Sequence, residues 1–291
     1  RSPGTSRGGV EGRGGRRRLP RPPARPARGR ARASSRREAG LPALSASLWR
    51  DRGDGALVDC PTVNDGLSLS QATLRFGDLT VLNAVDLELQ RGECLLVGGE
   101  SGSGKSTFLE VCAGLVTTTS GTVTLAGERP DLTRPSELFR RGVRRGYVFE
   151  GGGLIANLSA LANVELPLRY HADVLDLDSR ETDRRAREAL ARLRVGQSDL
   201  HALPAHLSFG VRKRVAMARA LALEPNFFFC DDPDSGLDAS TANLVYDLLV
   251  ELRDDPGVTM VVTTNSRVLL DRLRLRSKEL VSGYLMDRHF A

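Results

Sequence analysis

The sequence lacks an apolar run of membrane-spanning length, and it holds only four cysteines. The first absence predicts that the chain has no membrane span of its own. The cysteines show no metal-ligand spacing and three of them sit in apolar runs, which is typical of small buried side chains in a reducing compartment and not of a metal site. What the sequence does contain is 40% apolar residues over 291 positions, enough for one large domain or two small ones with a real core.

Acidic residues are almost missing from the first fifty positions, which hold 14 arginines against Glu11 and Glu38. The rest of the chain therefore carries a net charge of about −6, so the overall +6 does not by itself indicate nucleic-acid binding. We expect residues 1–60 to be disordered, because their Arg, Pro and Gly bury too little apolar surface to offset the entropy of ordering. They lack the apolar core of a secretory signal. A transit peptide, a tether to nucleic acid or lipid headgroups, and a translated upstream region outside the working protein remain open, and the last is favoured.

From residue 67 onward, short β-like runs alternate with helical ones, which predicts an α/β domain over 67–290. Between the fifth and sixth expected strands, about eighty residues have helical character, and they predict a second lobe at about 151–222. The clearest helix is 179–194, with Ser179 as its cap and two ion pairs four residues apart along it. The expected strands are 69–76, 81–89, 94–97, 122–125, 147–149, 227–230 and 259–263.

The stretch 99–107 fills the pattern G-x-x-x-x-G-K-[ST] directly after the apolar segment 94–97 and ahead of a helix-like run. Glycines let consecutive backbone N–H groups turn inward around a polyphosphate, while the following helix presents its positive N-terminus. We expect Lys105 to reach the phosphates and Ser106 to ligate Mg²⁺; a glycine-rich turn that binds nothing is the alternative. The predicted phosphate-binding residues are Gly99, Glu100, Ser101, Gly102, Ser103, Gly104, Lys105, Ser106 and Thr107.

A second motif, 227–232, consists of four apolar residues followed by Asp231 and Asp232. This is the form of a buried strand that delivers a carboxylate to Mg²⁺ at its carboxyl end. A buried strand that simply ends in acids is common, and alone it would carry no function. Together with the phosphate loop upstream, it predicts Asp231 as a metal ligand.

With these motifs, residues 67–290 resemble an ATP-binding cassette (ABC) ATPase subunit. Residues 207–221 resemble the family signature and its helix, 235–238 resemble the D-loop, and Phe76 lies where the family stacks an aromatic ring on adenine. The alternative for Phe76 is an ordinary core aromatic. The resemblance implies a P-loop NTPase fold of the ABC type, in which a RecA-like core carries an antiparallel β subdomain and an inserted α-helical subdomain.

The same resemblance implies a function. The chain is expected to bind ATP and Mg²⁺, to dimerise head to tail with Ser208 and Gly210 facing the partner's phosphate loop, and to work with a separate membrane permease from the cytoplasmic face of the membrane. The tract 154–170 is the candidate permease contact, or equally a plain core helix. Residues 154–169 and 211–215 are similar to ATPase subunits of phospholipid transporters linked to MCE proteins, and lipoprotein-releasing ATPases share much of the first tract.

Four positions depart from the family pattern. Glu150 replaces a Gln that touches Mg²⁺ and the attacking water, and Asp232 replaces the Glu that orients this water. Phe209 stands at the first glycine of the signature, where it blocks the approach to the phosphate unless its ring turns aside into the helical lobe. Thr264 replaces a His that bridges to the γ-phosphate, and Asp234 adds a further acid nearby. Because the phosphate loop is intact, the sequence predicts selective erosion of hydrolysis with retained nucleotide binding.

Three functions follow from the sequence. The first is a slow but competent ATPase that drives lipid or lipoprotein transport. The second is a degenerate ATP-binding module that needs an active partner subunit, as a heterodimer or through binding alone. The third, a soluble ABC protein acting on nucleic acid or ribosomes, is weakest, because such proteins usually carry two cassettes and this chain has one phosphate loop; no specific nucleic-acid partner is expected.

Overall fold

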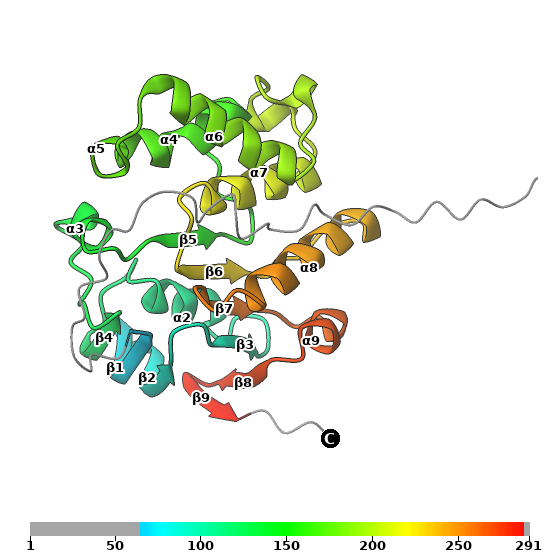
Figure 1. Ribbon diagram of the computed structural model, residues 1–291. Coiled ribbons are helices and arrows are strands. Elements are labelled where there is room, and N and C mark those ends of the chain that lie inside the picture. Colours follow the sequence, from blue (N-terminus) through cyan, green and yellow to red (C-terminus); the bar gives the residue numbers. More distant parts are fainter. Residues whose placement is uncertain (1–64, 288–291) are drawn as a thin grey trace, which may run out of the picture. The chain divides into compact units, whose positions relative to one another are not determined.

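The computed structural model describes residues 65–287, which form two sheets and a group of helices (Figure 1). The expected disorder of residues 1–60 falls outside the described residues. The first sheet is antiparallel with the order β2-β1-β4. Its strands alternate buried apolar and exposed polar side chains along much of their length, as expected for a sheet with one face on the core. The strands are β1 (Leu67–Phe76), β2 (Leu79–Leu89) and β4 (Ser120–Leu125).

The second sheet has six strands in the order β5-β6-β7-β3-β8-β9, parallel except for the last pair. All seven strands expected from the sequence are present in the two sheets, with ends moved by up to two residues. The hairpin β8–β9 was missed, because its mixed charged and exposed residues give no apolar run. The strands are β3 (Cys94–Gly98), β5 (Arg145–Val148), β6 (Phe227–Asp231), β7 (Thr259–Thr263), β8 (Arg276–Val281) and β9 (Tyr284–Asp287).

The central strands β3, β6 and β7 are buried at every residue, because helices or the other sheet cover both of their faces. Alternate residues of one strand therefore enter different cores: Phe228 joins the core that includes the helical lobe, and Phe227 and Phe229 join the core that includes the antiparallel sheet. The helices around this sheet are α2 (Lys105–Cys112), α3 (Pro135–Arg140), α8 (Ala239–Arg253) and α9 (Arg267–Leu273).

The remaining helices gather beyond the β5 edge of the sheet (Figure 1). They are α4 (Ala160–Tyr170), α5 (Ala172–Leu175), α6 (Ser179–Arg192) and α7 (Phe209–Leu221). In α6 the predicted ion pairs Glu181–Arg185 and Asp183–Arg187 are both present. The predicted cap was wrong: the Asp178 carboxylate, one residue earlier, accepts the hydrogen bond from the Glu181 N–H at 2.7 Å. The helix also ends two residues earlier than expected, at Arg192.

Candidate functional site

The phosphate loop lies between the carboxyl end of β3 and the start of α2. Gly99 has φ 141°, and a Cβ atom there would lie 2.6 Å from the carbonyl oxygen of Leu280. Gly104 caps α2 in the left-handed region with φ 96°. Any residue with a side chain would be strained at both positions, so the glycines of the motif are required by the backbone path.

The polar groups of this loop fit a polyphosphate. No side chain among the described residues caps the N-terminus of α2, and its first turn holds no acid, so its positive end is open to an anion. The Ser103 hydroxyl is buried without a hydrogen-bond partner among residues 65–287. The Lys105 ammonium folds back onto the loop, where it donates to the Gly99 and Glu100 carbonyls at 2.7 and 2.9 Å. These carbonyls bind an ammonium less strongly than a phosphate does. Ser106, the next residue after Lys105, is exposed.

Asp231 ends β6 at the level of the phosphate loop. Register fixes this, because Val97 of β3 pairs with Thr263 of β7, which in turn pairs with Asp231. The Thr263 hydroxyl, fully buried, donates to Asp231 Oδ1 at 2.5 Å and leaves the other carboxylate oxygen for a cation. The described residues contain no metal site built from three or more His, Cys, Asp or Glu, so Mg²⁺ here needs phosphate and water ligands, as is usual for this ion.

Thr263 was missed by the sequence analysis, although a signal exists. It is the polar last residue of an otherwise largely apolar buried strand, and it falls opposite Asp231 once the strands are paired.

Asp232 follows in an unusual conformation, with φ 42°. Its N–H is held by the carbonyl and hydroxyl oxygens of Thr263 at 3.1 and 3.3 Å. Burial raises the pKa of the Asp232 carboxyl, and the neighbouring Asp234, Glu150 and Asp231 carboxyls raise it further. The structure thus brings together the four acids that the sequence analysis singled out around 150 and 231–234.

The residues around Glu150 link it to the D-loop. Ser235 donates to Glu150 Oε1 at 3.5 Å, a long hydrogen bond. Asp234 is held from the other side by the Tyr246 hydroxyl of α8 at 2.5 Å. Asp234 is therefore anchored by a short hydrogen bond, whereas Glu150 is exposed and has only the long one.

Thr264 is fully buried, and its hydroxyl oxygen accepts from the Ser266 N–H at the start of α9 at 2.9 Å. The side chain that touches the phosphate loop is instead that of Asn265, whose Oδ1 accepts from the Gly99 N–H at 3.2 Å. A contact between Thr264 and a phosphate stays a prediction. The role of Asn265 was not foreseen, since nothing local in the sequence relates positions 166 residues apart.

The two aromatic residues of interest have different surroundings. Phe76, at the end of β1, is 56% exposed, so the core-aromatic alternative was wrong and the ring is free to stack on a base; the stacking itself stays a prediction.

Phe209 is the first residue of α7, after Ser208, whose hydroxyl caps the helix. Its ring lies against Gly236, where an added Cβ would approach it to 3.0 Å, and the Arg212 guanidinium lies 5.7 Å from its centroid. The ring thus covers the D-loop of its own chain instead of turning into the helical lobe.

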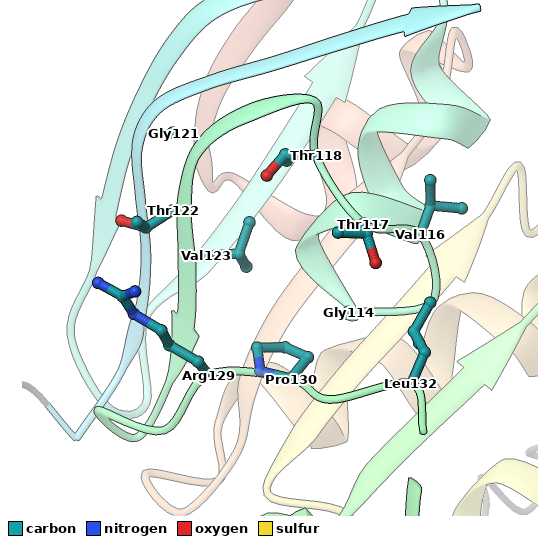
Figure 2. Close-up of a pocket in the computed structure, with 10 residues that line it drawn as sticks. All are labelled: Gly114, Val116, Thr117, Thr118, Gly121, Thr122, Val123, Arg129, Pro130 and Leu132. Carbon is teal, nitrogen blue, oxygen red and sulfur yellow. The ribbon is translucent and has the colours of Figure 1, made fainter. Parts of the chain in front are cut away.

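Figure 2 shows a separate hollow of about 140 Å³ between β4, the segment after α2 and residues 129–132. Gly114, Thr117 and Thr118 line it beyond the C-terminal end of α2, whereas the phosphate loop lies at the N-terminal end. None of the predicted site residues lines it. The nucleotide motifs therefore lie at the carboxyl ends of β3 and β6 and not in this pocket.

Comparison with known proteins agrees with this geometry. The sequence profile of the ABC transporter family matches residues 82–235. The chain is 37% identical over 211 residues to the uncharacterized ABC transporter ATP-binding protein YbbA of Escherichia coli strain K12, covering 72% of this chain and 90% of that protein. It is 37% identical over 214 residues to the lipoprotein-releasing system ATP-binding protein LolD of Shewanella sp. strain MR-4, covering 72% and 89%.

A solved structure gives the same result. The chain is similar, with a TM-score of 0.68 and 30% identity, to the dimeric ATP-binding cassette MJ0796 bound to ADP and Pi in a post-hydrolysis state; the match covers 77% of this chain and 100% of that one. The expected fold class, a P-loop NTPase of the ABC type, is thereby confirmed. The site agrees with this, because the phosphate loop precedes α2 and Asp231 lies at the same level of the sheet. The chain therefore belongs to the ABC transporter family and is an ATP-binding subunit.

Proposed function

We propose that this chain binds Mg-ATP with ordinary affinity but hydrolyses it slowly, as the ATP-binding subunit of a lipid-class ABC transporter. The observation that carries the proposal is the contrast within one site. Mg-ATP fits the phosphate loop with its Lys105, and Asp231, which Thr263 holds in place. The other acids around these groups, in contrast, bring additional negative charge to the site. The chain pairs with a membrane permease and a second ATP-binding subunit, as members of this family do.

Binding follows from the loop. The N-terminal N–H groups of α2 and the Lys105 ammonium would offset the phosphate charge, and Ser106 and Asp231 would hold Mg²⁺. When bound, Mg-ATP supplies the phosphoryl group that reacts with water. Phe76 is exposed where it stacks on the base.

Weak turnover follows from the altered residues. Asp232 carries its carboxylate about one bond length further back than a Glu, and a misplacement of about 1 Å costs on the order of 10²-fold in rate. Burial first, and the neighbouring carboxyls second, raise the pKa of Asp232, so its surroundings disfavour negative charge, whereas the transition state concentrates such charge. Glu150 cannot donate a hydrogen bond to the attacking water, and the buried Thr264 hydroxyl is a shorter and neutral donor in place of a cationic imidazole.

The cargo proposal depends on two likenesses. LolD, at 37% identity, belongs by its name to a lipoprotein-releasing system. The resemblance of the tract 154–169 to phospholipid-transport ATPases comes from the sequence analysis alone. We favour phospholipid over lipoprotein as the cargo. Among residues 65–287 no helix is long and apolar enough to cross a bilayer, and we place the chain at the inner face of the membrane against its permease.

The experiment measures Mg-ATP affinity and steady-state hydrolysis on the full chain, with Asp232→Glu and Thr264→His made singly and together. We expect micromolar to sub-millimolar affinity in all four proteins, and turnover that rises by about 10²-fold in the double variant. Ordinary turnover in the unmodified chain, with no gain from either change, would contradict the weakened-hydrolysis part. No binding of Mg-ATP would contradict the function itself.

A heterodimer with an active partner is the second candidate, and Phe209 favours it. In a homodimer both composite sites would carry this ring on the signature, whereas a partner with an intact signature leaves one site open to the phosphate. Size measurements with Mg-ATP separate the two cases: a chain that dimerises alone, and no better after Phe209→Gly, would exclude the need for such a partner.

A further inference from the structure

Lys213 is the one lysine of α7, and it is 1% exposed. A buried ammonium needs partners, because the loss of its hydration is costly. Lys213 takes part in no ion pair among the described residues. Its Nζ donates instead to backbone carbonyl oxygens from two different segments.

The two segments are those that carry the acids of the nucleotide site. The shortest hydrogen bonds run to the Glu150 carbonyl at 2.7 Å and the Asp232 carbonyl at 3.0 Å. Longer ones run to the Asp231 carbonyl at 3.3 Å and the Phe149 carbonyl at 3.4 Å. An ammonium has three donors, so one cation ties the end of β5 to the end of β6. A single side chain thereby fixes where Glu150 and Asp232 leave their strands.

The backbone at Asp232 explains why such a tie is needed. A residue other than glycine with φ 42° is strained and persists only where its surroundings hold it. Thr263 holds the N–H of Asp232, and Lys213 holds its carbonyl. The Asp232 peptide is thus clamped on both sides of its side chain.

Lys213 also changes the electrostatic surroundings of Asp232. Lys213 lowers the pKa of the Asp232 carboxyl, whereas burial and the Asp234, Glu150 and Asp231 carboxyls raise it. Lys213 therefore offsets part of the negative charge that these acids place around Asp232.

We propose that Lys213 is a positioning residue of the nucleotide site: it sets the separation of Glu150 and Asp232 and offsets their charge, so that Mg-ATP binds beside four carboxyls. This inference rests on the proposed function. A merely structural role is the competing explanation, and α7 offers a matched control. Arg219 on the same helix also donates to backbone carbonyls, those of Gly152 and Gly153, but it does not reach Asp232.

The test is a double-mutant cycle on the full chain, with the dissociation constant of Mg-ATP as readout and thermal unfolding without nucleotide as a second one. Lys213→Met is made in the unmodified chain and in Glu150→Gln, and Arg219→Met in both. We expect Lys213→Met to weaken Mg-ATP binding by about tenfold or more in the first background and by about threefold or less in the second, where one acid is gone. Arg219→Met should change the affinity by less than about twofold in both.

The possible results distinguish a positioning role of Lys213 from a merely structural one. An equal loss from Lys213→Met in both backgrounds, or the same background-dependent loss from Arg219→Met, overturns the positioning role and leaves a structural one. Unchanged affinity in Lys213→Met also overturns it, while the proposed function stands. An unmodified chain that does not bind Mg-ATP overturns both. If Lys213→Met unfolds, Lys213→Gln, which keeps a donor without the charge, replaces it in the cycle with the same criteria.

Discussion

Replacing Thr263 with valine tests how Asp231 is held. The exchange keeps the shape and the strand preference of a buried β7 residue but removes the hydroxyl that donates to Asp231 Oδ1 at 2.5 Å. A hydrogen bond to a charged group contributes about 1.5–3 kcal/mol, so we expect the free energy of unfolding to fall by that amount. The Asp232 N–H also loses one acceptor, which adds to the loss in the same direction.

Thr259→Val on the same strand is the control. Thr259 is 2% exposed, and its hydroxyl accepts from the uncharged Gly92 N–H at 3.1 Å. A neutral hydrogen bond is worth about 0.5–1.5 kcal/mol, so we expect Thr259→Val to lower the free energy of unfolding by less than Thr263→Val does. Urea unfolding at neutral pH measures both free energies, and the melting temperature should follow by about 2–4 °C per kcal/mol in a domain of this size.

Mg-ATP binding supplies the second half of this test. Thr263→Val lets the Asp231 carboxylate rotate, so we expect weaker binding with Mg²⁺ and little change for ATP in EDTA. Thr259→Val should change neither. If Thr263→Val destabilises the chain no more than Thr259→Val, or weakens binding equally with and without Mg²⁺, the reasoning that Thr263 orients a metal ligand is refuted.

Three further substitutions test single side chains. Burial and nearby carboxyls raise the pKa of Asp232 in the folded state. The free energy of unfolding therefore falls as the pH rises from the unfolded-state pKa through the higher folded-state pKa. Asp232→Asn should raise the melting temperature at pH 7.5 and lose this gain as the pH falls toward 4. Hydrogen bonds from hydroxyls and N–H groups at the start of α8 lower the pKa of Asp238. Asp238→Asn should therefore lower the melting temperature at pH 7.5, and lower it less in acid. If the two substitutions change the melting temperature in the same direction, the assignment of the two pKa shifts is contradicted. Phe76→Ala should weaken ATP binding by about 5- to 150-fold, from about 1–3 kcal/mol of stacking, with unfolding changed by less than about 0.5 kcal/mol. Val268→Ala, also exposed, is its control in an affinity measurement, and equal effects of the two would remove the stacking role.

Several features were predictable because they depend on neighbouring residues. The phosphate loop is fixed by glycines at positions where φ is positive, and seven strands follow from apolar runs. The ion pairs of α6 follow from a spacing of four residues. The misplaced cap, Asp178 in place of Ser179, shows the limit of this reasoning, since both residue types cap helices and only the backbone path chooses between them.

The family membership was therefore determined by the sequence alone, and the nucleotide site was predicted from motifs of neighbouring residues. Tertiary structure decided how the site is held. Thr263 reaches Asp231 only through the register of β6 and β7, and Asn265, just after β7, reaches Gly99 at the end of the neighbouring strand β3. Lys213 meets Glu150, 63 residues earlier, because α7 packs against the ends of β5 and β6. A buried charge finds its partners through packing of the whole chain, and no local pattern encodes which carbonyls those are.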